Sequence, residues 1–330
     1  MNNAEKKYPA LVSIIVPVYN RENLIKIAIN TVLNQSYTDW EMIIIDDSSS
    51  DNTKEVVTHF SNSDSRIKLI DNKFAKGPSG TRNTGLDIAS GDYIAYLDSD
   101  DEWMPFHLER MIACFERHPE IDVMSADPLR KNRSTGEVVS YDKLNLSNID
   151  HRSFEDCSII DYGDLFDHQL RGRVITTQCI VGKSDILKSV RWNESLGNAV
   201  DNLYNLEVCA KRINVGHIED YHAIYWIHDD NLSNVSGSHS PQRMEKLHLG
   251  FIKYWQIVAN KFNLSNMQKR YVNSNLATTY AWHLGYHTYE PQKKYREAIN
   301  CYLKAIKYTP YNFKNYFALI KAFVKLVIRR

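Results

Sequence analysis

Residues 11–53 read LVSIIVPVYNRENLIKIAINTVLNQSYTDWEMIIIDDSSSDNT, and this stretch decides the fold. The runs SIIVPV and EMIII are short, apolar and rich in β-branched residues, whereas residues 22–33 between them repeat apolar side chains at helical spacing. RIKLI and YIAYL continue the strand signal farther along, again with helical patterns between and after them. This alternation predicts a Rossmann-like α/β domain, a mostly parallel sheet with helices on both faces and ligands at the carboxyl ends of its strands.

The rest of the chain is patterned less regularly. Residues 128–167 are polar and weakly periodic, which predicts loops and short elements that could shape an acceptor site. VITTQCIVG at 174–182 predicts one more strand, and a further helix and strand follow it. From Pro241 onward the pattern is helical throughout. We therefore predict two domains, an α/β domain over residues 1–240 and an all-α region over residues 241–330.

Composition excludes several functional classes. Forty basic and forty acidic residues cancel, so no overall field attracts a polyanion, and we expect no nucleic-acid partner. The five cysteines are odd in number and include no CxxC pair, which argues against a disulfide framework and a thiolate zinc site. The first residues lack the apolar core of a signal peptide, and no segment reaches the ~18 apolar residues of a membrane span. We expect a cytoplasmic protein, either soluble or peripheral on the inner face of the cell membrane.

The helical region offers two contact surfaces, each open to two interpretations. Aromatic and small residues at 282–310 nearly match one tetratricopeptide-type helix pair, but a single unit cannot build a solenoid, so we expect either a packed appendage or a partner-binding repeat. The apolar stripe of the last helix, between Phe317 and Ile328, suits either peripheral contact with a membrane or docking on the protein itself. The opposite stripe of this helix is basic: Lys314, Lys321, Lys325 and Arg329.

A polar, acidic loop follows the strand EMIII. It begins with Asp46 and Asp47 and continues through three serines to Asp51. Because the loop lies where an open α/β sheet binds ligands, a carboxylate there can accept hydrogen bonds from a base N–H or from ribose hydroxyls. Asp51 is better explained as the cap of the next helix. We predict that Asp46 or Asp47 contacts a nucleotide.

A second acidic cluster, Asp98, Ser99, Asp100 and Asp101, directly follows YIAYL. Two carboxylates two residues apart can hold a divalent cation, and Mg²⁺ or Mn²⁺ typically takes one or two carboxylates together with phosphate oxygens. A solvated acidic turn is the alternative, but like charges at a buried strand end repel one another unless something neutralises them. We therefore predict a Mn²⁺ or Mg²⁺ site here, on a strand next to the one that carries the first acidic loop.

Between the two clusters, residues 77–92 place Arg82 near a helix start, where it either meets phosphate or forms a structural ion pair with an aspartate. Two phosphate-loop patterns are absent. Gly182-Lys183-Ser184 resembles the end of a phosphate loop, but the glycine required earlier would fall at Thr177. No GxGxxG follows the first strand, which excludes the usual nicotinamide and flavin sites.

These blocks together resemble the family 2 glycosyltransferases of GT-A fold. The similarity is dense over residues 11–103 and looser to about residue 236; GPSGTRNTGLDIASGDYIAYLDSDDEW is similar to the family's second block. The resemblance implies a hexosyl- or N-acetylhexosaminyltransferase that moves a sugar from a nucleotide-diphosphate donor, UDP-linked in our expectation, with inversion at the anomeric carbon. The implied acceptor is a hydroxyl of a glycan or lipid-linked sugar, in cell-surface polysaccharide or glycoconjugate synthesis.

The resemblance also implies roles for individual residues. The base of the donor would lie near Pro17 and Tyr19, Asp98 would lie near its ribose, and Asp100 would hold the metal that bridges its two phosphates. The full set of predicted nucleotide contacts is Pro17, Tyr19, Asn20, Asp46, Asp47, Ser49, Arg82, Asp98 and Ser99.

Two further residues follow from the same resemblance. The family's acid pair before a helix falls at Val200 and Asp201, so its Glu is replaced and Asp201 remains as the predicted catalytic base. A carboxylate suits this role, because the acceptor proton becomes acidic as its oxygen attacks, while a metal stabilises the departing diphosphate. His228, in YWIHDDNLS, is predicted to touch metal or phosphate, with a purely structural histidine as the alternative.

Two other functions compete with this one. A nucleotidyltransferase also combines a nucleotide, a metal and paired aspartates, but it would carry a loop rich in Gly and Lys after the first strand, and VPVYNREN has no glycine. A degenerate glycosyltransferase domain that acts as a binding scaffold through the C-terminal helices is the third alternative. The retained aspartates count against it.

Overall fold

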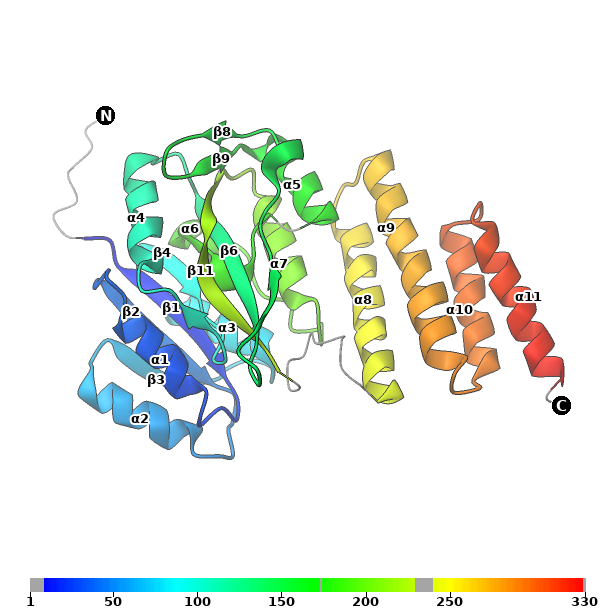
Figure 1. Ribbon diagram of the computed structural model, residues 1–330, viewed down its shortest axis with the longest axis horizontal. Coiled ribbons are helices and arrows are strands. Elements are labelled where there is room, and N and C mark those ends of the chain that lie inside the picture. The colour runs from blue at the N-terminus through cyan, green and yellow to red at the C-terminus, as the bar shows by residue number, and fades with distance from the viewer. Residues whose placement is uncertain (1–8, 173, 229–239, 329–330) are drawn as a thin grey trace. The chain divides into compact units, whose positions relative to one another are not determined.

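The computed structural model describes residues 9–172, 174–228 and 240–328 (Figure 1). The chain divides into two compact units: residues up to 194 with 204–228 form the first, and residues 195–203 with the chain after His228 form the second. In the described ranges, no helix has the length and apolar character needed to cross a membrane. The boundary near residue 240 that we predict for a catalytic domain stays a prediction.

The first unit is built on one sheet. Its described strands run in the order β3-β2-β1-β4-β10-β6-β11-β9-β8, with β5 paired to β11 and β7 to β6. Strands β3, β2, β1 and β4 are mutually parallel, as are β6 and β11, while β10 runs antiparallel between β4 and β6. The strands are β1 (Val12–Val18), β2 (Trp40–Asp46), β3 (Ile67–Asp71), β4 (Tyr93–Tyr96), β5 (Glu102–Trp103), β6 (Val123–Asn132), β7 (Val138–Tyr141), β8 (Arg152–Ser153), β9 (Ser158–Ile160), β10 (Val181–Lys183) and β11 (Val215–Ile227).

Helices cover both faces of this sheet, as predicted (Figure 1). Alternate residues of β1 point to opposite faces, and Ile14 and Val16 share one core with α1, α2 and α4. On the other face α3 lies so close that a Cβ added at Gly85 would sit 2.5 Å from Ile15 Cγ2. The helices of this unit, the last of which continues from the second unit, are α1 (Ile25–Leu33), α2 (Thr53–Ser63), α3 (Pro78–Ile88), α4 (His107–Arg117), α5 (Tyr162–Arg171), α6 (Ser184–Lys188) and α7 (Val200–Cys209).

Strand β6 is absent from our sequence prediction, which places loops after Pro128. A proline inside a strand normally argues against a central position, and the buried Asp127 breaks the apolar pattern. The structure accommodates Pro128 opposite Ala223, beside register shifts in β11 that mark a bulge. The strand predicted over residues 174–182 is also shorter than expected: Thr177–Cys179 forms a 3₁₀ turn, and only β10 is extended.

The second unit is helical, as predicted. Segment 195–203 packs with it, since Asn198 Nδ2 donates to the Leu247 carbonyl at 2.9 Å. Gly250 makes this approach possible, because a Cβ there would lie 1.4 Å from Asn198 Oδ1. Its elements are α8 (Pro241–Lys261), α9 (Asn266–Thr278), the π-helical η3 (Thr279–Tyr289), α10 (Tyr295–Tyr308) and α11 (Phe313–Ile328).

A buried pair of histidines joins α4 to β11 in the first unit. The Nδ1 atoms of His107 and His222 lie 3.2 Å apart, and both residues are fully buried. Burial is the main cause that lowers the pKa of His222 to about 3 and that of His107 well below its ordinary range. Both imidazoles are therefore neutral in the folded protein, with one donating to the other.

We expect this pair to make the free energy of unfolding fall by about 3 kcal/mol between pH 7.5 and pH 5.5. Below the ordinary histidine pKa, both histidines are protonated in the unfolded chain and remain neutral in the folded chain. The free energy of unfolding therefore decreases as the pH falls from the ordinary pKa toward the folded-state pKa. Urea denaturation at the two pH values measures the loss. His107→Gln with His222→Gln should flatten this dependence, and His59→Gln, an exposed histidine, should not; an unchanged slope in the double variant would refute the assignment.

Candidate functional site

The predicted site residues gather at the carboxyl edge of β2, β1 and β4. Val18 of β1 pairs in register with Asp46 of β2, and Leu97, just before Asp98, donates to the carbonyl of Ile15. Strand β1 lies between β2 and β4, so the two acidic clusters are not on neighbouring strands, contrary to our expectation. Two strand spacings separate them by roughly 10 Å. A ligand that touches both clusters must therefore cross the tip of β1.

The loops that follow β1 and β2 are bonded to each other. Asn20 N donates to Ser49 Oγ at 3.0 Å, and Asn20 Oδ1 accepts from Ser50 N at 2.8 Å. Arg21 N donates to Thr53 Oγ1 at 2.8 Å. Asn20 has φ 50°, a left-handed conformation that asparagine tolerates better than most residues. Asn20 and Ser49, both predicted nucleotide contacts, thus shape the surface at the tip of β1.

Asp46 and Asp47 are buried and hold loops of the chain itself. Asp47 accepts from Asn72 Nδ2 at 2.8 Å and from Gly77 N at 2.7 Å. Asp46 Oδ2 accepts from Ser49 N at 3.0 Å and lies 3.5 Å from the Lys54 ammonium. These contacts were not anticipated from the sequence. They fix the loops that follow β2 and β3, and the predicted contact with a nucleotide stays a prediction.

Tyr19 is the exposed aromatic residue of this edge. Its side chain is 43% exposed, and Lys76 Nζ lies 4.2 Å from its ring centroid. Pro17 lies two residues earlier, paired with Ile45 in β2. An open ring beside a cation provides a surface on which a flat base can stack and an anionic group can rest. Lys76 was missed because a lone lysine in a loop carries no sequence signal.

Asp98 forms an ion pair with Arg82. Arg82 Nη2 lies 2.6 Å from Asp98 Oδ1, and its guanidinium carbon lies 4.4 Å from the Trp192 ring centroid. Arg82 is almost fully buried, while about a quarter of the Asp98 side chain is exposed. The structural ion pair is thus present, and a contact of Arg82 with phosphate stays a prediction. Ser99, the next residue, is buried.

Asp100 and His228 meet although 128 residues separate them. His228 Nε2 lies 3.1 Å from Asp100 Oδ2, and Arg21 Nε lies 3.8 Å from the same oxygen. Burial alone would raise the pKa of Asp100, but the hydrogen bond to His228 and the charge of Arg21 lower it overall. Asp100 is therefore held as an anion. Arg21 was not predicted, because the sequence around it reads only as a helix start.

This donor set fits a divalent cation of the Mg²⁺ or Mn²⁺ type. A carboxylate oxygen and an imidazole nitrogen face each other at 3.1 Å, and such ions take few protein ligands when phosphate oxygens complete the shell. Asp101, the next acidic residue, is buried, and its Oδ1 accepts from Trp226 N at 3.1 Å. Burial first, then the charges of Asp100 and Asp98, raises the pKa of Asp101 well above its ordinary value. Asp101 therefore ties the turn to β11 rather than facing a ligand.

Asp201 lies in the first turn of α7, after the buried Val200. An acidic residue is favourable in that turn because the helix dipole is positive there. The second half of α7 is fixed in the first unit, where Tyr204 stacks on Trp192 at 3.9 Å and its hydroxyl lies 2.7 Å from that of Tyr96. The catalytic role of Asp201 stays a prediction.

A polar cavity of about 540 Å³ adjoins β6 and β11. Asp127 and His217 line it and are almost fully buried, with 3.3 Å between Asp127 Oδ1 and His217 Nε2. This approach lacks hydrogen-bond geometry, and among the described residues neither Asp127 Oδ2 nor either imidazole nitrogen of His217 has a hydrogen-bond partner. Arg130 and Lys143 add positive charge to the lining. Buried polar groups without partners are costly, so the cavity suits a ligand rich in hydroxyls.

The sequence is also similar to that of known proteins. Residues 13–157 match the family described as Glycosyl transferase family 2. The chain is 44% identical over 141 residues to the Escherichia coli UDP-Glc:alpha-D-GlcNAc-diphosphoundecaprenol beta-1,3-glucosyltransferase WfgD. The aligned region is 42% of this chain and 54% of that protein. It is 46% identical over 91 residues to the Campylobacter jejuni GalNAc(5)-diNAcBac-PP-undecaprenol beta-1,3-glucosyltransferase, covering 27% of this chain and 29% of that protein. The chain thus matches about half of the first relative and less than a third of the second.

Solved structures show the same fold. S. aureus TarS in complex with UDP-GlcNAc superposes with a TM-score of 0.59 at 20% identity, over 95% of this chain and 87% of that one. The mannosyltransferase PcManGT from Pyrobaculum calidifontis, in complex with GDP-Man and Mn²⁺, superposes with a TM-score of 0.55 at 15% identity, over 97% of this chain and 87% of that one. Residues 13–157, somewhat less than half of the chain, therefore match glycosyl transferase family 2, and the fold of the chain is the GT-A fold.

Proposed function

We propose that this protein transfers a sugar from a nucleotide-diphosphate donor to an acceptor hydroxyl, with inversion and with Mn²⁺ or Mg²⁺ as cofactor. The observation that carries the proposal is the convergence of Asp100, His228 and Arg21 at one strand edge. UDP is the nucleotide we expect, because the E. coli relative is named for UDP-Glc and TarS was solved with UDP-GlcNAc. The match of residues 13–157 to this family supports the same reaction class.

In this proposal, different residues at the edge bind different parts of the donor. The base stacks on Tyr19, and the ribose lies against Asp98, which Arg82 holds in place. Asp100 and His228 would hold the cation, and Arg21 would add a positive charge beside the phosphates of the donor. A bound Mn²⁺ or Mg²⁺ supplies stabilisation of the negative charge on the departing diphosphate.

Transfer is a single displacement at the anomeric carbon. The acceptor oxygen forms its bond to C1 on the face opposite the diphosphate, the C1–O bond to phosphate breaks, and configuration inverts. The acceptor proton passes to the Asp201 carboxylate during this step. The electron pair of the broken bond leaves with the nucleoside diphosphate.

We place the acceptor sugar in the cavity that contains Asp127 and His217. Asp127→Asn should raise the KM for acceptor about tenfold, the effect of one weakened charged hydrogen bond, and leave the KM for donor unchanged. Asn retains the Oδ1 atom that accepts from Leu144 N at 2.9 Å, so the loop beside the cavity stays in place. Steady-state kinetics with each substrate varied measures the split. Asp87→Asn, which removes an exposed carboxylate, is the control, and equal effects on both KM values would exclude the cavity.

The acceptors named for both relatives carry undecaprenol, so we infer that the acceptor here is also lipid-linked. Such an acceptor stays in the bilayer, and the donor is water-soluble. The protein would then work as a peripheral protein on the cytoplasmic face of the membrane, in polysaccharide or glycoconjugate synthesis.

A screen of nucleotide sugars tests the function. Purified protein should release UDP or another nucleoside diphosphate from one of them in the presence of Mn²⁺, and EDTA should abolish the release. Release of pyrophosphate from a nucleoside triphosphate and a sugar phosphate would instead identify a nucleotidyltransferase. Failure of every nucleotide sugar to bind or react would leave the scaffold interpretation.

A further inference from the structure

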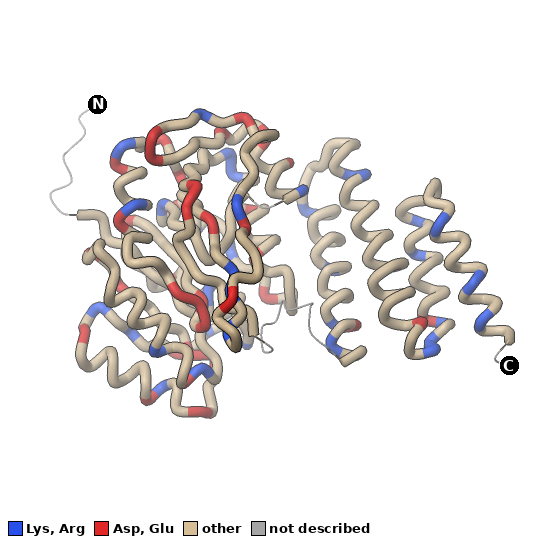
Figure 2. The backbone as a smooth tube through the Cα atoms, viewed as in Figure 1, with Lys and Arg blue, Asp and Glu red and all other residues tan. Residues whose placement is uncertain are grey.

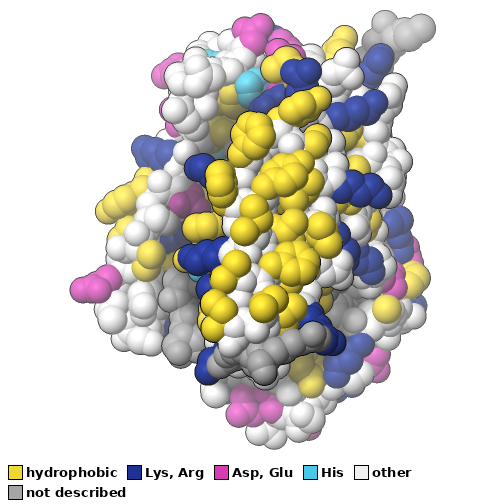
Figure 3. Space-filling model, turned by 90° about the vertical axis from the view of Figure 1, so that its right-hand side faces the viewer, with side chains coloured by type: hydrophobic (Ala, Val, Ile, Leu, Met, Phe, Trp, Pro, Cys, Tyr) yellow, Lys and Arg dark blue, Asp and Glu magenta, His cyan; other side chains and the backbone are white. Residues whose placement is uncertain are grey.

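Helix α11 contacts its own unit through a narrow strip only. Asn315 and Ala322 are its buried residues, and Leu319 is partly buried between them. The opposite face is apolar and open, as the space-filling view shows (Figure 3). Its side chains are 47% to 78% exposed: Phe317, Ile320, Phe323, Val324, Val327 and Ile328. The stripe therefore does not dock on the described part of the chain, which was one of our two expectations.

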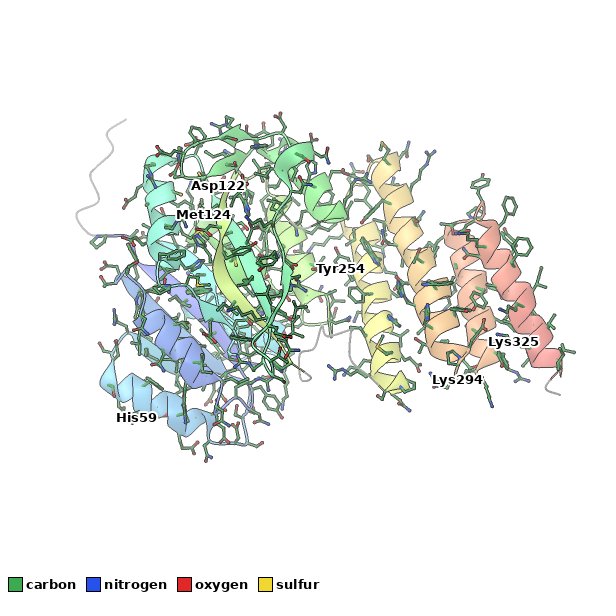
Figure 4. The ribbon with its side chains drawn as sticks, in the orientation of Figure 1. His59, Asp122, Met124, Tyr254, Lys294 and Lys325 are labelled. Atoms are coloured by element: carbon green, nitrogen blue, oxygen red, sulfur yellow. The ribbon has the colours of Figure 1, made fainter. Side chains whose placement is uncertain are left out.

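The charged residues around this stripe are mostly basic. Helix α11 contains three lysines and no acidic residue (Figure 2). Residues 293–328 contain eight Lys or Arg and one acidic residue, Glu297. Lys325 is engaged with the carboxylate of Glu290, and Figure 4 labels it on α11. Lys314 and Lys321 are exposed.

An apolar patch of this kind normally marks an interaction site. We compare two occupants, a second copy of the chain and a membrane. In a twofold dimer the same patch faces itself, so the lysines of one copy would approach those of the other without an acidic partner on α11. An anionic bilayer offers acyl chains for the apolar side chains and negative headgroups for the lysines. Charge complementarity therefore favours the membrane.

We propose that α11 is an interfacial anchor that lies in the plane of an anionic lipid surface. Phe317, Phe323 and Val327 enter the boundary between headgroups and acyl chains, and Lys314 and Lys321 bind lipid phosphates. The anchor gives the proposed transferase access to a lipid-linked acceptor, and this biological purpose rests on the proposed function. Lipid binding itself requires no transferase activity.

Vesicle flotation tests the anchor. The full chain should float with phosphatidylcholine vesicles that contain phosphatidylglycerol, bind weakly to pure phosphatidylcholine, and dissociate as salt is raised. Lys314→Gln with Lys321→Gln should weaken binding about thirtyfold, since each lysine near an anionic surface contributes a factor of about five. Phe317→Ser with Val324→Ser should reduce binding at every salt concentration. The matched control, Lys26→Gln with Lys211→Gln, removes the same charge from exposed sites elsewhere and should bind as the parent protein does.

Three results would overturn the proposal: equal vesicle binding by the lysine variant and its control, vesicle binding that does not depend on phosphatidylglycerol, or no vesicle binding at all. Light scattering without vesicles identifies the competing occupant, because self-association abolished by Phe317→Ser with Val324→Ser would assign the stripe to a dimer. Donor hydrolysis without vesicles should be equal in parent and variants. Vesicle binding by a protein without hydrolysis would reject the proposed function and leave the anchor standing.

Discussion

Asp100→Asn should lower metal-dependent turnover by about a thousandfold, equivalent to about 4 kcal/mol of transition-state stabilisation. The substitution keeps the shape of the side chain and its ability to meet His228 at 3.1 Å, but it removes the negative charge. Without that charge the site loses its main attraction for a divalent ion. Thermal stabilisation by nucleotide sugar should then become independent of Mn²⁺, whereas in the parent protein Mn²⁺ should increase it.

Asp71→Asn is the matched control for this experiment. Asp71 is the last residue of β3, at the same edge of the sheet, and its side chain is 77% exposed. It loses the same charge and should keep full activity. If Asp100→Asn retained Mn²⁺-dependent turnover, the cation would bind elsewhere and the mechanism proposed for the diphosphate would be wrong.

The parallel half of the sheet was predictable because β1, β2 and β4 are dominated by apolar residues and β3 retains the short pattern IKLID. Strand β2 is buried at all seven positions, and such a run between turn signals has few alternatives. Strand β6 was not predictable, since Asp127 and Pro128 interrupt its apolar pattern where it pairs with the bulge of β11 beside a cavity. The local pattern of apolar residues predicts a buried strand well when the buried side chains are apolar. The same pattern does not reveal a strand whose buried side chains are polar.

The site shows the same division. Family resemblance implied that Asp100 holds the metal and that His228 touches metal or phosphate, and the structure places these two side chains 3.1 Å apart. Arg21 beside them follows from a loop conformation set by Asn20 and Thr53. Periodicity contains no information about such contacts between distant segments. The resemblance also could not reveal that Asp46 accepts a hydrogen bond within its own loop and that Asp47 accepts two from the loop after β3.

Cysteine spacing contains no information about contacts between distant segments. The absence of a CxxC pair argues against a thiolate zinc site, and this stays a prediction; possible ligand atoms of Cys114, Asp156 and Cys157 nevertheless lie within 4.8 Å of one another. Asp156 is already neutralised by Arg117, whose Nε lies 2.9 Å from Asp156 Oδ2. The cluster arises because α4 packs against the segment before β9. Only the tertiary structure could bring two scattered cysteines together.

Asp201→Asn should lower transfer by a factor of about a thousand while leaving donor affinity unchanged, which separates it from the Asp100 variant. A general base acts only when the acceptor hydroxyl loses its proton, so its removal slows chemistry without weakening the ground-state complex. The measurement is kcat for sugar transfer beside Mn²⁺-dependent binding of the nucleotide sugar. Asp185→Asn is the matched control, because Asp185 is an exposed acidic residue in the first turn of another helix.

An acceptor series distinguishes a base from a residue that only positions the acceptor. A hydroxyl made more acidic by a neighbouring fluorine needs less help in losing its proton, so the defect of Asp201→Asn should shrink with such acceptors. A positioning residue would cause the same defect with every acceptor. Because the family's Glu is replaced by Val200, whose buried side chain cannot accept a proton, no neighbouring carboxylate in the pair can take over. Transfer at the parent rate by Asp201→Asn would therefore move the base to a different element of the fold.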